Sequence, residues 1–527
     1  MKKQPPSIFN DVIGPIMRGP SSSHTAASVR IGSIIRQFFN NQLEYIHTTF
    51  EPTGSLASTY NNQGTDFGLI GGILGMKPEH PDLVNALSIA ADNKIDVSFK
   101  IDIFEASHPN TFKIRAGSGK DEHNFKFISS GGGMLELQEI DDIPVSSHGD
   151  YHEFLLFTAT LDNGFIEHHM DLVKKIVPDY DYCLFSKNDK SGLIILKTLV
   201  PLSPEQIREM NRLERVNKTV RLEPVLPVRS NKQCNVPFDS AAGALEASMD
   251  KLRTLADLAI DYECARGEIT ENDVLELADH VLKTMKSSVE EGLAGTEFDD
   301  RILGVQSQKI SSFRGNLSGG ERDRKIISMI TAIMETKSAM GVIVAAPTAG
   351  SCGCLPGTLF AVAEEFELDQ VVIRDGLLAA GLIGVFIAMR STFAAEECGC
   401  QAECGAASGM TAAGVAHMLG GSTNQCLDAA AMALQNIMGM VCDPVAERVE
   451  VPCLGKNIMA AFNAIASANM ALAGYDKVIP LDETITALHQ AGTMLPVELR
   501  CTGKAGLSVT TTAKQVRNTL LGKKENL

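Results

Sequence analysis

The chain has 527 residues, 44% of them hydrophobic, so it is long enough for several domains and too apolar to be mostly disordered. Its 64 Asp and Glu against 47 Lys and Arg give a formal net charge of −17, which argues against general affinity for nucleic acid or anionic membranes. The first residues, Met-Lys-Lys-Gln-Pro-Pro, lack the apolar segment of a secretory signal, and the longest apolar run, 376–389, is too short to span a bilayer. We therefore expect a cytoplasmic protein with no nucleic-acid partner and no membrane association.

Residues 1–225 alternate between strand-like and helix-like segments, which predicts an α+β N-terminal domain. Residues 29–39 have apolar side chains at helical spacing and predict a helix, and residues 167–176 predict another. Residues 140–225 could form a separate subdomain. Period-two alternation and short apolar runs predict strands at 97–103, 111–115, 124–128, 154–161 and 192–199.

Prolines among polar residues predict a linker at 226–240, after which strand signals become rare. Ala- and Gly-rich segments with helical spacing then follow one another. Residues 241–527 are therefore predicted to form an all-α C-terminal domain, a helical bundle. Its helices are expected at 241–262, 271–293, 322–336, 355–365, 376–388, 406–419, 426–440, 457–472 and 479–491.

The cysteines are concentrated in the C-terminal half, where nine of the twelve lie between Cys352 and Cys501. In a reducing compartment this density favours metal binding or catalysis over disulfides, although a free cysteine is also a common core residue. The spacing matches neither a two-plus-two zinc site nor a ferredoxin run, so it identifies neither the metal nor the ligands. Several thiols fall on predicted loops at helix ends, where they can be directed at one point.

Two polar segments are candidates for substrate binding. Residues 21–25, Ser-Ser-Ser-His-Thr, stand where a helix is predicted to begin, and free amides and hydroxyls there can bind a carboxylate. His24 is suited to act as a base, although a serine cap with an exposed histidine explains the same pattern. Residues 346–354 place Thr348 and Ser351 among small residues, either as a narrow polar site or as a simple connection between helices.

Together these motifs resemble the iron–sulfur-dependent L-serine dehydratases, or L-serine ammonia-lyases. The motifs stand in the order of that family and at similar spacing, whereas residues 140–230 are less familiar. In the N-terminal half the resemblance rests on residues 19–25, 54–56, 64–66 and 130–133, and in the C-terminal half on 346–353, 399–403, 442–445, 451–453 and 499–500.

The resemblance implies a [4Fe–4S] cluster held by Cys400, Cys442 and Cys453, with one iron open to act as a Lewis acid on the β-hydroxyl of the substrate. His24 is expected to be the base or its partner, and the site is expected to draw on both halves of the chain. The implied partner is a small amino acid, which would yield pyruvate and ammonia, and the implied assembly is a homodimer. The expected substrate-binding residues are Ser21, Ser22, Ser23, Thr25, Thr65, Asp66, Thr348, Ala349, Gly350 and Ser351.

The sequence departs from the family pattern at two places. Where Gly-His-x-Thr-Asp is expected, residues 62–66 read Asn-Gln-Gly-Thr-Asp, and Gln63 cannot act as a base. Either His24 does that work alone or the substrate differs from serine. The chain also ends in Glu-Asn-Leu, with no terminal thiol to cap an open iron.

Three other functions compete with serine dehydration. The first is a related iron–sulfur lyase acting on threonine, cysteine or another β-substituted amino acid. The second is a pyridoxal-phosphate dehydratase, which needs a lysine in a strand–loop setting that the sequence does not provide. The third is an inactive binding or regulatory protein whose cysteines are merely buried.

Overall fold

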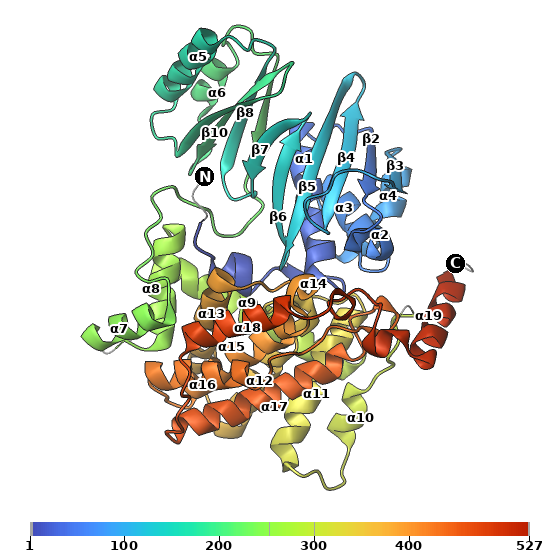
Figure 1. The fold of residues 1–527 in the computed structure, drawn as a ribbon, viewed down its shortest axis with the longest axis vertical. Helices are drawn as coiled ribbons and strands as arrows, with labels where there is room; N and C mark the ends of the chain where they lie inside the picture. The colour runs from blue at the N-terminus through green and yellow to red at the C-terminus, as the bar shows by residue number, and fades with distance from the viewer. Residues whose placement is uncertain (1–3, 252, 300, 525–527) are drawn as a thin grey trace. The chain divides into compact units, whose positions relative to one another are not determined.

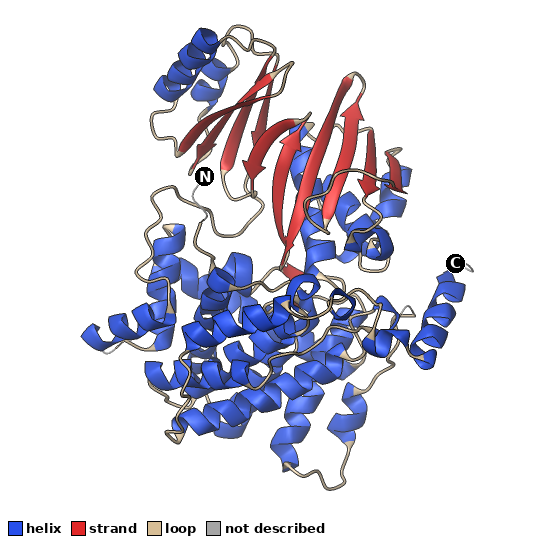
Figure 2. Ribbon diagram, in the orientation of Figure 1, coloured by secondary structure: helices blue, strands red, loops and turns tan. Residues whose placement is uncertain are grey.

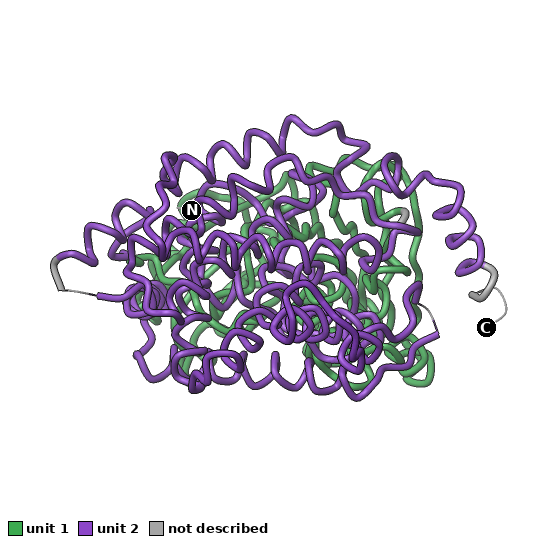
Figure 3. The backbone as a smooth tube through the Cα atoms, turned by 90° about the horizontal axis from the view of Figure 1, so that it is seen from below, with its two compact units in different colours: residues 1–4, 23–130, 134–234 green, residues 5–22, 131–133, 235–527 purple. Residues whose placement is uncertain are grey.

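The computed structural model describes residues 4–251, 253–299 and 301–524, which divide into two compact units (Figure 3). Unit 1 comprises residues 23–130 and 134–234 together with Gln4, and unit 2 comprises residues 5–22, 131–133 and those from 235 onwards. The N-terminal region is rich in sheet and the C-terminal region is helical, as predicted (Figure 2). Unit 1 ends at Cys234, and unit 2 resumes at Asn235.

A six-stranded sheet with the strand order β3-β2-β4-β5-β6-β7 forms the first part of unit 1 (Figure 1). Strands β2 and β3 pair in parallel, whereas β2–β4, β4–β5 and β6–β7 pair antiparallel. The strands are β2 (Tyr45–Phe50), β3 (Asp96–Ile101), β4 (Thr111–Ser118), β5 (Asp121–Gly131), β6 (Met134–Ile140) and β7 (Ile143–Ser147). The helices are α1 (Ala27–Phe38), α2 (Ser55–Thr59), α3 (Thr65–Ile73) and α4 (Ala86–Asp92).

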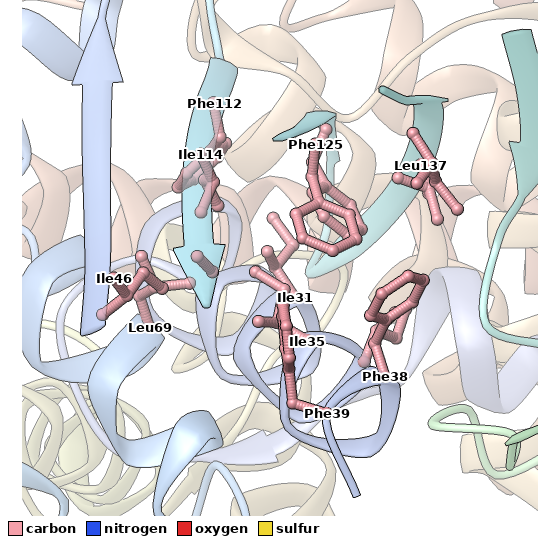
Figure 4. Close-up of a cluster of buried hydrophobic side chains, with 14 of the residues drawn as sticks. Ile31, Ile35, Phe38, Phe39, Ile46, Leu69, Phe112, Ile114, Phe125 and Leu137 are labelled. Atoms are coloured by element: carbon pink, nitrogen blue, oxygen red, sulfur yellow. The ribbon is translucent and has the colours of Figure 1, made fainter. Parts of the chain in front are cut away.

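The core of this part lies between helix α1 and the sheet (Figure 4). Ile31, Ile35 and Phe38 recur at helical spacing along α1 and are all buried. The ring of Phe38 meets that of Phe125 in β5 edge to face, with 4.9 Å between the ring centroids. The apolar residues whose spacing predicted this helix therefore form the face that packs against the sheet.

The second part of unit 1 is a separate antiparallel sheet with the order β11-β8-β10-β9. Its elements follow one another as βαββαβ, the ferredoxin-like arrangement. This sheet begins later than the expected boundary at residue 140, because β7 belongs to the six-stranded sheet. The elements are β8 (His152–Thr158), α5 (Asn163–Ile176), β9 (Tyr182–Lys187), β10 (Gly192–Thr198), α6 (Pro204–Met210) and β11 (Lys218–Leu222).

The described residues of unit 2 are mainly helical, with one short antiparallel strand pairing, β1 (Ile16–Met17) with β12 (Ile343–Val344), and an isolated bridge between Cys442 and Arg500. The all-α prediction lacked β12. The helices are α7 (Ala241–Lys251), α8 (Leu255–Gly267), α9 (Glu271–Ala294), α10 (Ser307–Ser312), α11 (Gly320–Ser338), α12 (Cys354–Phe366), α13 (Gln370–Arg390), α14 (Ala395–Cys398), α15 (Ala406–Met418), α16 (Thr423–Gln435), α17 (Cys453–Leu472), α18 (Leu481–Thr493) and α19 (Thr511–Lys524). The single helix expected at 241–262 is two helices, because Thr254 caps a new one: its hydroxyl accepts a hydrogen bond from the Asp257 amide.

Helix α13 is long and apolar enough to cross a membrane by length and composition, but 67% of its most apolar window is buried inside the structure. Its neighbours explain that composition. The π-helical turn Ile8–Val12 packs against it, and a Cβ added at Gly384 would lie 2.0 Å from Val12 Cγ1. Helix α13 is thus a core helix of unit 2.

Residues 5–22 belong to unit 2, although they precede unit 1 in the chain. Ile8 and Val12 are fully buried against helices of unit 2. Glu263 in α8 accepts hydrogen bonds from the Ser7 hydroxyl and, at 2.8 Å, from the Ile8 amide. An N-terminal segment can join a core far along the chain because burial depends on contact in space and not on sequence order.

Candidate functional site

The three thiols expected to bind a cluster come from three separate segments of unit 2. Cys400 precedes the π-helical turn Gln401–Gly405, Cys442 lies in the loop between α16 and α17, and Cys453 begins α17. All three are free and at most 4% exposed. The Sγ atoms of Cys400 and Cys442 and a carboxylate oxygen of Glu403 lie within 4.8 Å of one another, a spacing suited to a bound metal.

Two further thiols, those of Cys404 and Cys501, complete this group. Hydrogen bonds from Cys404 and Cys442 hold the pKa of the Cys400 thiol well below its usual value. Burial raises the pKa of Cys453, and the negative charge of Cys400 raises it further. Cys501 lies against Cys442, and the Cys501 amide donates to the Cys442 carbonyl at 3.0 Å. A buried set of free thiols of this kind suits iron–sulfur ligation.

Charged side chains surround these thiols. The Lys456 ammonium lies 2.9 Å from a carboxylate oxygen of Asp443. Burial works to lower the pKa of Lys456, but the negative charges of Cys400 and Asp443 outweigh burial and leave that pKa above its usual value. Burial raises the pKa of Glu403 to about 8, with a further contribution from the charge on Cys400.

The loop expected to bind substrate lies directly beside the thiols. Thr348 Oγ1 donates to Glu403 Oε1 at 2.7 Å, and the Ser351 hydroxyl donates to the Ala346 carbonyl at 3.1 Å. A Cβ added at Gly350 would lie 2.8 Å from Glu403 Oε1, so only glycine allows this approach without a shift. The loop and the segment that carries Cys400 therefore meet at Glu403.

One buried amide, that of Asn457 in α17, joins the loop to the thiols. Its Nδ2 donates to the carbonyls of Gly350 and Cys453 at 2.8 and 2.9 Å, and it lies 3.6 Å from Cys404 Sγ. Its Oδ1 accepts from the amides of Gly353 and Cys354 at 3.2 and 3.1 Å. The Asn457 side chain thus holds loop 346–354 against the start of α17.

In unit 1, His24 is buried within a network of hydroxyl groups. Its Nε2 lies 2.9 Å from Thr59 Oγ1, and its Nδ1 lies 3.2 Å from Ser23 Oγ. Because the Thr59 hydroxyl donates its own proton to the Ser55 carbonyl at 2.6 Å, Nε2 is the donor toward Thr59 and Nδ1 is the basic nitrogen. Burial lowers the pKa of His24 to about 4, so its imidazole is neutral near pH 7.

Two further predicted substrate-binding residues of unit 1 are Thr25 and Thr65. Thr25 Oγ1 donates to the Gln63 carbonyl at 2.9 Å, and Gln63 is buried. The hydroxyl of Thr65 is buried, with no hydrogen-bond partner among the described residues. An unpartnered buried hydroxyl is costly, so Thr65 is a fitting group to meet a polar ligand.

The comparisons with known proteins cover both halves of the chain. Residues 205–508 match the family model described as "Serine dehydratase alpha chain", and residues 9–139 match "Serine dehydratase beta chain". The L-serine dehydratase of Haemophilus influenzae is 32% identical over 518 residues, which is 93% of this chain and 96% of the relative. The chain belongs to the serine dehydratase family.

The relatives also include separate subunits. The probable L-serine dehydratase alpha chain of Bacillus subtilis is 38% identical over 287 residues, 54% of this chain and 96% of the relative. The L-serine dehydratase alpha chain of Peptoniphilus asaccharolyticus is 35% identical over 268 residues, 50% of this chain and 92% of the relative. This serine dehydratase therefore carries alpha- and beta-type regions in one chain, which confirms the family and the enzyme class predicted from the motifs.

The predicted site residues of this serine dehydratase fall into two groups. Ser23, His24, Thr25, Thr65 and Asp66 belong to unit 1. Ser21, Ser22, the loop residues Thr348, Ala349, Gly350 and Ser351, and the thiols of Cys400, Cys442 and Cys453 belong to unit 2. The structure brings the loop and the thiols together, and the substrate-binding and catalytic roles stay predictions.

Sequence reasoning missed Glu403, Asn457, Lys456 and Cys501. Glu403 ends the motif at 399–403, and Asn457 follows Cys453 by four residues. Cys501 follows residues 499–500, which the resemblance includes. Their closeness to the motifs in the sequence could have drawn attention to them. Only the fold shows that their side chains contact the thiol-bearing segments and loop 346–354.

Proposed function

We propose that this chain dehydrates and deaminates L-serine to pyruvate and ammonia, with a [4Fe–4S] cluster held by Cys400, Cys442 and Cys453. The observation that carries the proposal is that the Sγ atoms of Cys400 and Cys442 and a carboxylate oxygen of Glu403 lie within 4.8 Å of one another, next to Thr348 of loop 346–354. Cys453 is also a buried free thiol, and the charge of Cys400 raises its pKa. Membership of the serine dehydratase family and the L-serine dehydratases among the relatives support the substrate.

The chemistry divides between the cluster and the protein. Elimination breaks the Cα–H and Cβ–O bonds, releases water, and leaves aminoacrylate, which tautomerises and is hydrolysed to pyruvate and ammonia. An iron–sulfur cluster with one iron not bound by the protein supplies a Lewis acid for departure of the hydroxyl. The polypeptide must supply the base, a binding site for the carboxylate, and a fixed orientation of Cα–H toward the base.

His24 is the group that we assign to proton removal or to its support. Its neutral imidazole has the basic Nδ1 directed at the Ser23 hydroxyl and Nε2 fixed by Thr59. A neutral imidazole can accept a proton at neutral pH, and the Ser23 hydroxyl next to it can relay one. Replacing His24 with Gln should lower kcat while the protein stays folded, and full turnover by His24→Gln would remove this role.

The carboxylate of the substrate is assigned to the hydroxyls and amides of residues 348–351, which lie in unit 2 with the thiols. At Thr348 the hydroxyl is positioned by Glu403. A Thr348→Val substitution keeps the shape of the side chain and removes the hydroxyl, so we expect it to raise KM. An unchanged KM would exclude the hydroxyl from substrate binding.

The deciding experiment measures pyruvate released from L-serine by anaerobically purified protein, before and after exposure to air, together with iron and sulfide content. We expect activity that requires iron and is lost in air, without a need for pyridoxal phosphate.

Cys400→Ser, Cys442→Ser and Cys453→Ser should lose iron and activity together. Cys426→Ser is the matched control, because Cys426 in α16 is also a buried thiol but is not one of the proposed ligands. Its Sγ donates to the Gly421 carbonyl at 3.7 Å. Steady activity in air would contradict the cluster.

Gln63 gives a specific reason to test other β-substituted amino acids. This buried residue stands where the family pattern has a histidine. L-threonine would yield 2-oxobutanoate, and L-cysteine would yield pyruvate with hydrogen sulfide. A higher kcat/KM for one of these than for L-serine in iron-replete protein would replace L-serine as the substrate.

A further inference from the structure

Two lysine side chains with little exposure, Lys456 and Lys337, donate hydrogen bonds to the segments that carry Cys442 and Cys453. Lys456 lies one helical turn after Cys453 in α17, with its side chain 15% exposed. Lys337 lies in the last turn of α11 and is fully buried. A buried ammonium is costly unless charges and acceptors compensate it, so both positions call for an explanation.

The contacts of Lys456 explain its position. Its Nζ donates to the Val441 carbonyl at 2.7 Å and to the Asp443 carboxylate at 2.9 Å. Val441 and Asp443 are the residues on either side of Cys442. The other oxygen of Asp443 accepts from the Leu507 amide at 2.9 Å, which fixes the carboxylate. One ammonium therefore holds the chain on both sides of Cys442 from the helical turn that carries Cys453.

Lys337 holds the segment that leads into Cys453, as Lys456 holds the segment around Cys442. Its Nζ donates to the Val449 carbonyl, in the stretch that leads into Cys453. Its charge also acts on Cys453 and on Glu403. The next residue along, Glu450, accepts from the amides of residues 302 and 303 at 2.9 Å each, which anchors the same stretch from the other side.

We propose that Lys456, supported by Lys337, is a positioning residue that holds Cys442 and Cys453 at a common centre and offsets the negative charge of the bound thiolates. The inference rests on the proposed cluster. Outer groups that orient metal ligands contribute to metal affinity, and nearby charge shifts the reduction potential of an iron–sulfur centre. A cation close to the cluster favours its reduced, more negative state.

The test uses the full chain, loaded with iron and sulfide under anaerobic conditions, and compares Lys456→Met, Lys456→Arg and Asp443→Asn. The readouts are the midpoint potential of the cluster from a redox titration followed by EPR, and the rate of iron release to a chelator. Lys477→Met is the control, because Lys477 pairs with Asp428 at 2.9 Å beyond the far end of α17, roughly 30 Å along the helix from Cys453. Circular dichroism checks that each variant is folded.

We expect Lys456→Met to make the midpoint potential more negative and to speed iron release by about tenfold or more. Lys456→Arg should restore both values toward wild type, and Asp443→Asn should shift the potential in the positive direction. If Lys456→Met does not fold, the opposite shift in Asp443→Asn and the retention of iron by Lys456→Arg still decide the matter.

Two results would overturn the proposal, and they differ in what else they overturn. Folded, loaded Lys456→Met and Asp443→Asn proteins with the potential and iron release of Lys477→Met would exclude the positioning role and leave the proposed function standing. A wild-type chain that takes up no iron would overturn the cluster, and the role of Lys456 with it.

Discussion

His24 and Cys400 are both buried, yet their pKa values are lowered for different reasons. Desolvation lowers the pKa of His24, whereas hydrogen bonds from neighbouring thiols lower the pKa of Cys400 against the effect of burial. The neutral imidazole is thus a product of burial, and the acidity of Cys400 is a product of its thiol neighbours.

The low pKa of His24 predicts a dependence of stability on pH. In the folded chain this pKa is about 4, below the usual histidine value of 6.5, so between these values the unfolded chain binds more protons. The contribution is fully present above pH 6.5 and is lost as the pH falls through about 4, to a total of about 3 kcal/mol. NMR titration of His24 should show a neutral imidazole at pH 5.5, and His24→Gln should weaken the loss of stability on acidification. A resonance of His24 that titrates near 6.5 would contradict the burial effect.

Asn457 is predicted to be essential for the shape of the site. Its side chain satisfies buried amides and carbonyls on both loop 346–354 and the start of α17. Asn457→Leu would leave these groups unpaired, so we expect a loss of about 3 kcal/mol or more in the free energy of unfolding. Asn436→Ala, which removes an exposed contact to Asn463 at 2.9 Å, should cost less than about 1 kcal/mol. Similar denaturant midpoints for the two variants would show that Asn457 is not the link.

At the scale of elements, small residues let helices approach closely in unit 2. Gly384 in α13 faces Val12. Gly414 in α15 faces the Gly376 carbonyl, and a Cβ added at Gly414 would lie only 2.8 Å from that oxygen.

The π-helical turn Gln401–Gly405 adds one residue to the usual helical turn directly after Cys400. Such turns are frequent at functional sites, where they redirect side chains.

A pair of glycine substitutions tests this close packing. Gly384→Ala places a methyl group 2.0 Å from Val12 Cγ1, so we expect it to destabilise unit 2 by about 1–3 kcal/mol. Gly455→Ala, in the first turn of α17 with nothing within 4 Å of the added Cβ, should instead stabilise by up to about 1 kcal/mol. Thermal unfolding of both variants measures the difference. A shift of the same sign in both would mean that the contact with Val12 does not limit the packing.

For the whole molecule, the two compact units should respond differently to metal removal. All the proposed ligands lie in unit 2, and none lies in unit 1. Because a ligand that binds only the folded state stabilises it, loss of the cluster should lower the stability of unit 2 alone.

Calorimetry of the loaded chain and of the same chain after chelation checks this prediction. We expect the transition of unit 2 to move to lower temperature while that of unit 1 stays in place. Cys453→Ser protein should behave like chelated wild type from the start, and Cys183→Ser, with its thiol in β9 of unit 1, should behave like loaded wild type. Equal shifts in both transitions would place the metal elsewhere.

The sequence by itself determined the family, the α+β and helical regions, and most helices of unit 2, because apolar periodicity and short motifs are local properties of the chain. It also indicated which cysteines to examine through the motifs around Cys400, Cys442 and Cys453. Only the tertiary structure decided that residues 5–22 join unit 2, that Cys501 lies against Cys442, and that Asn457 and Lys456 tie the segments together. These are contacts between residues up to hundreds of positions apart, and no local pattern encodes them because they form only when separate elements bury their surfaces against one another.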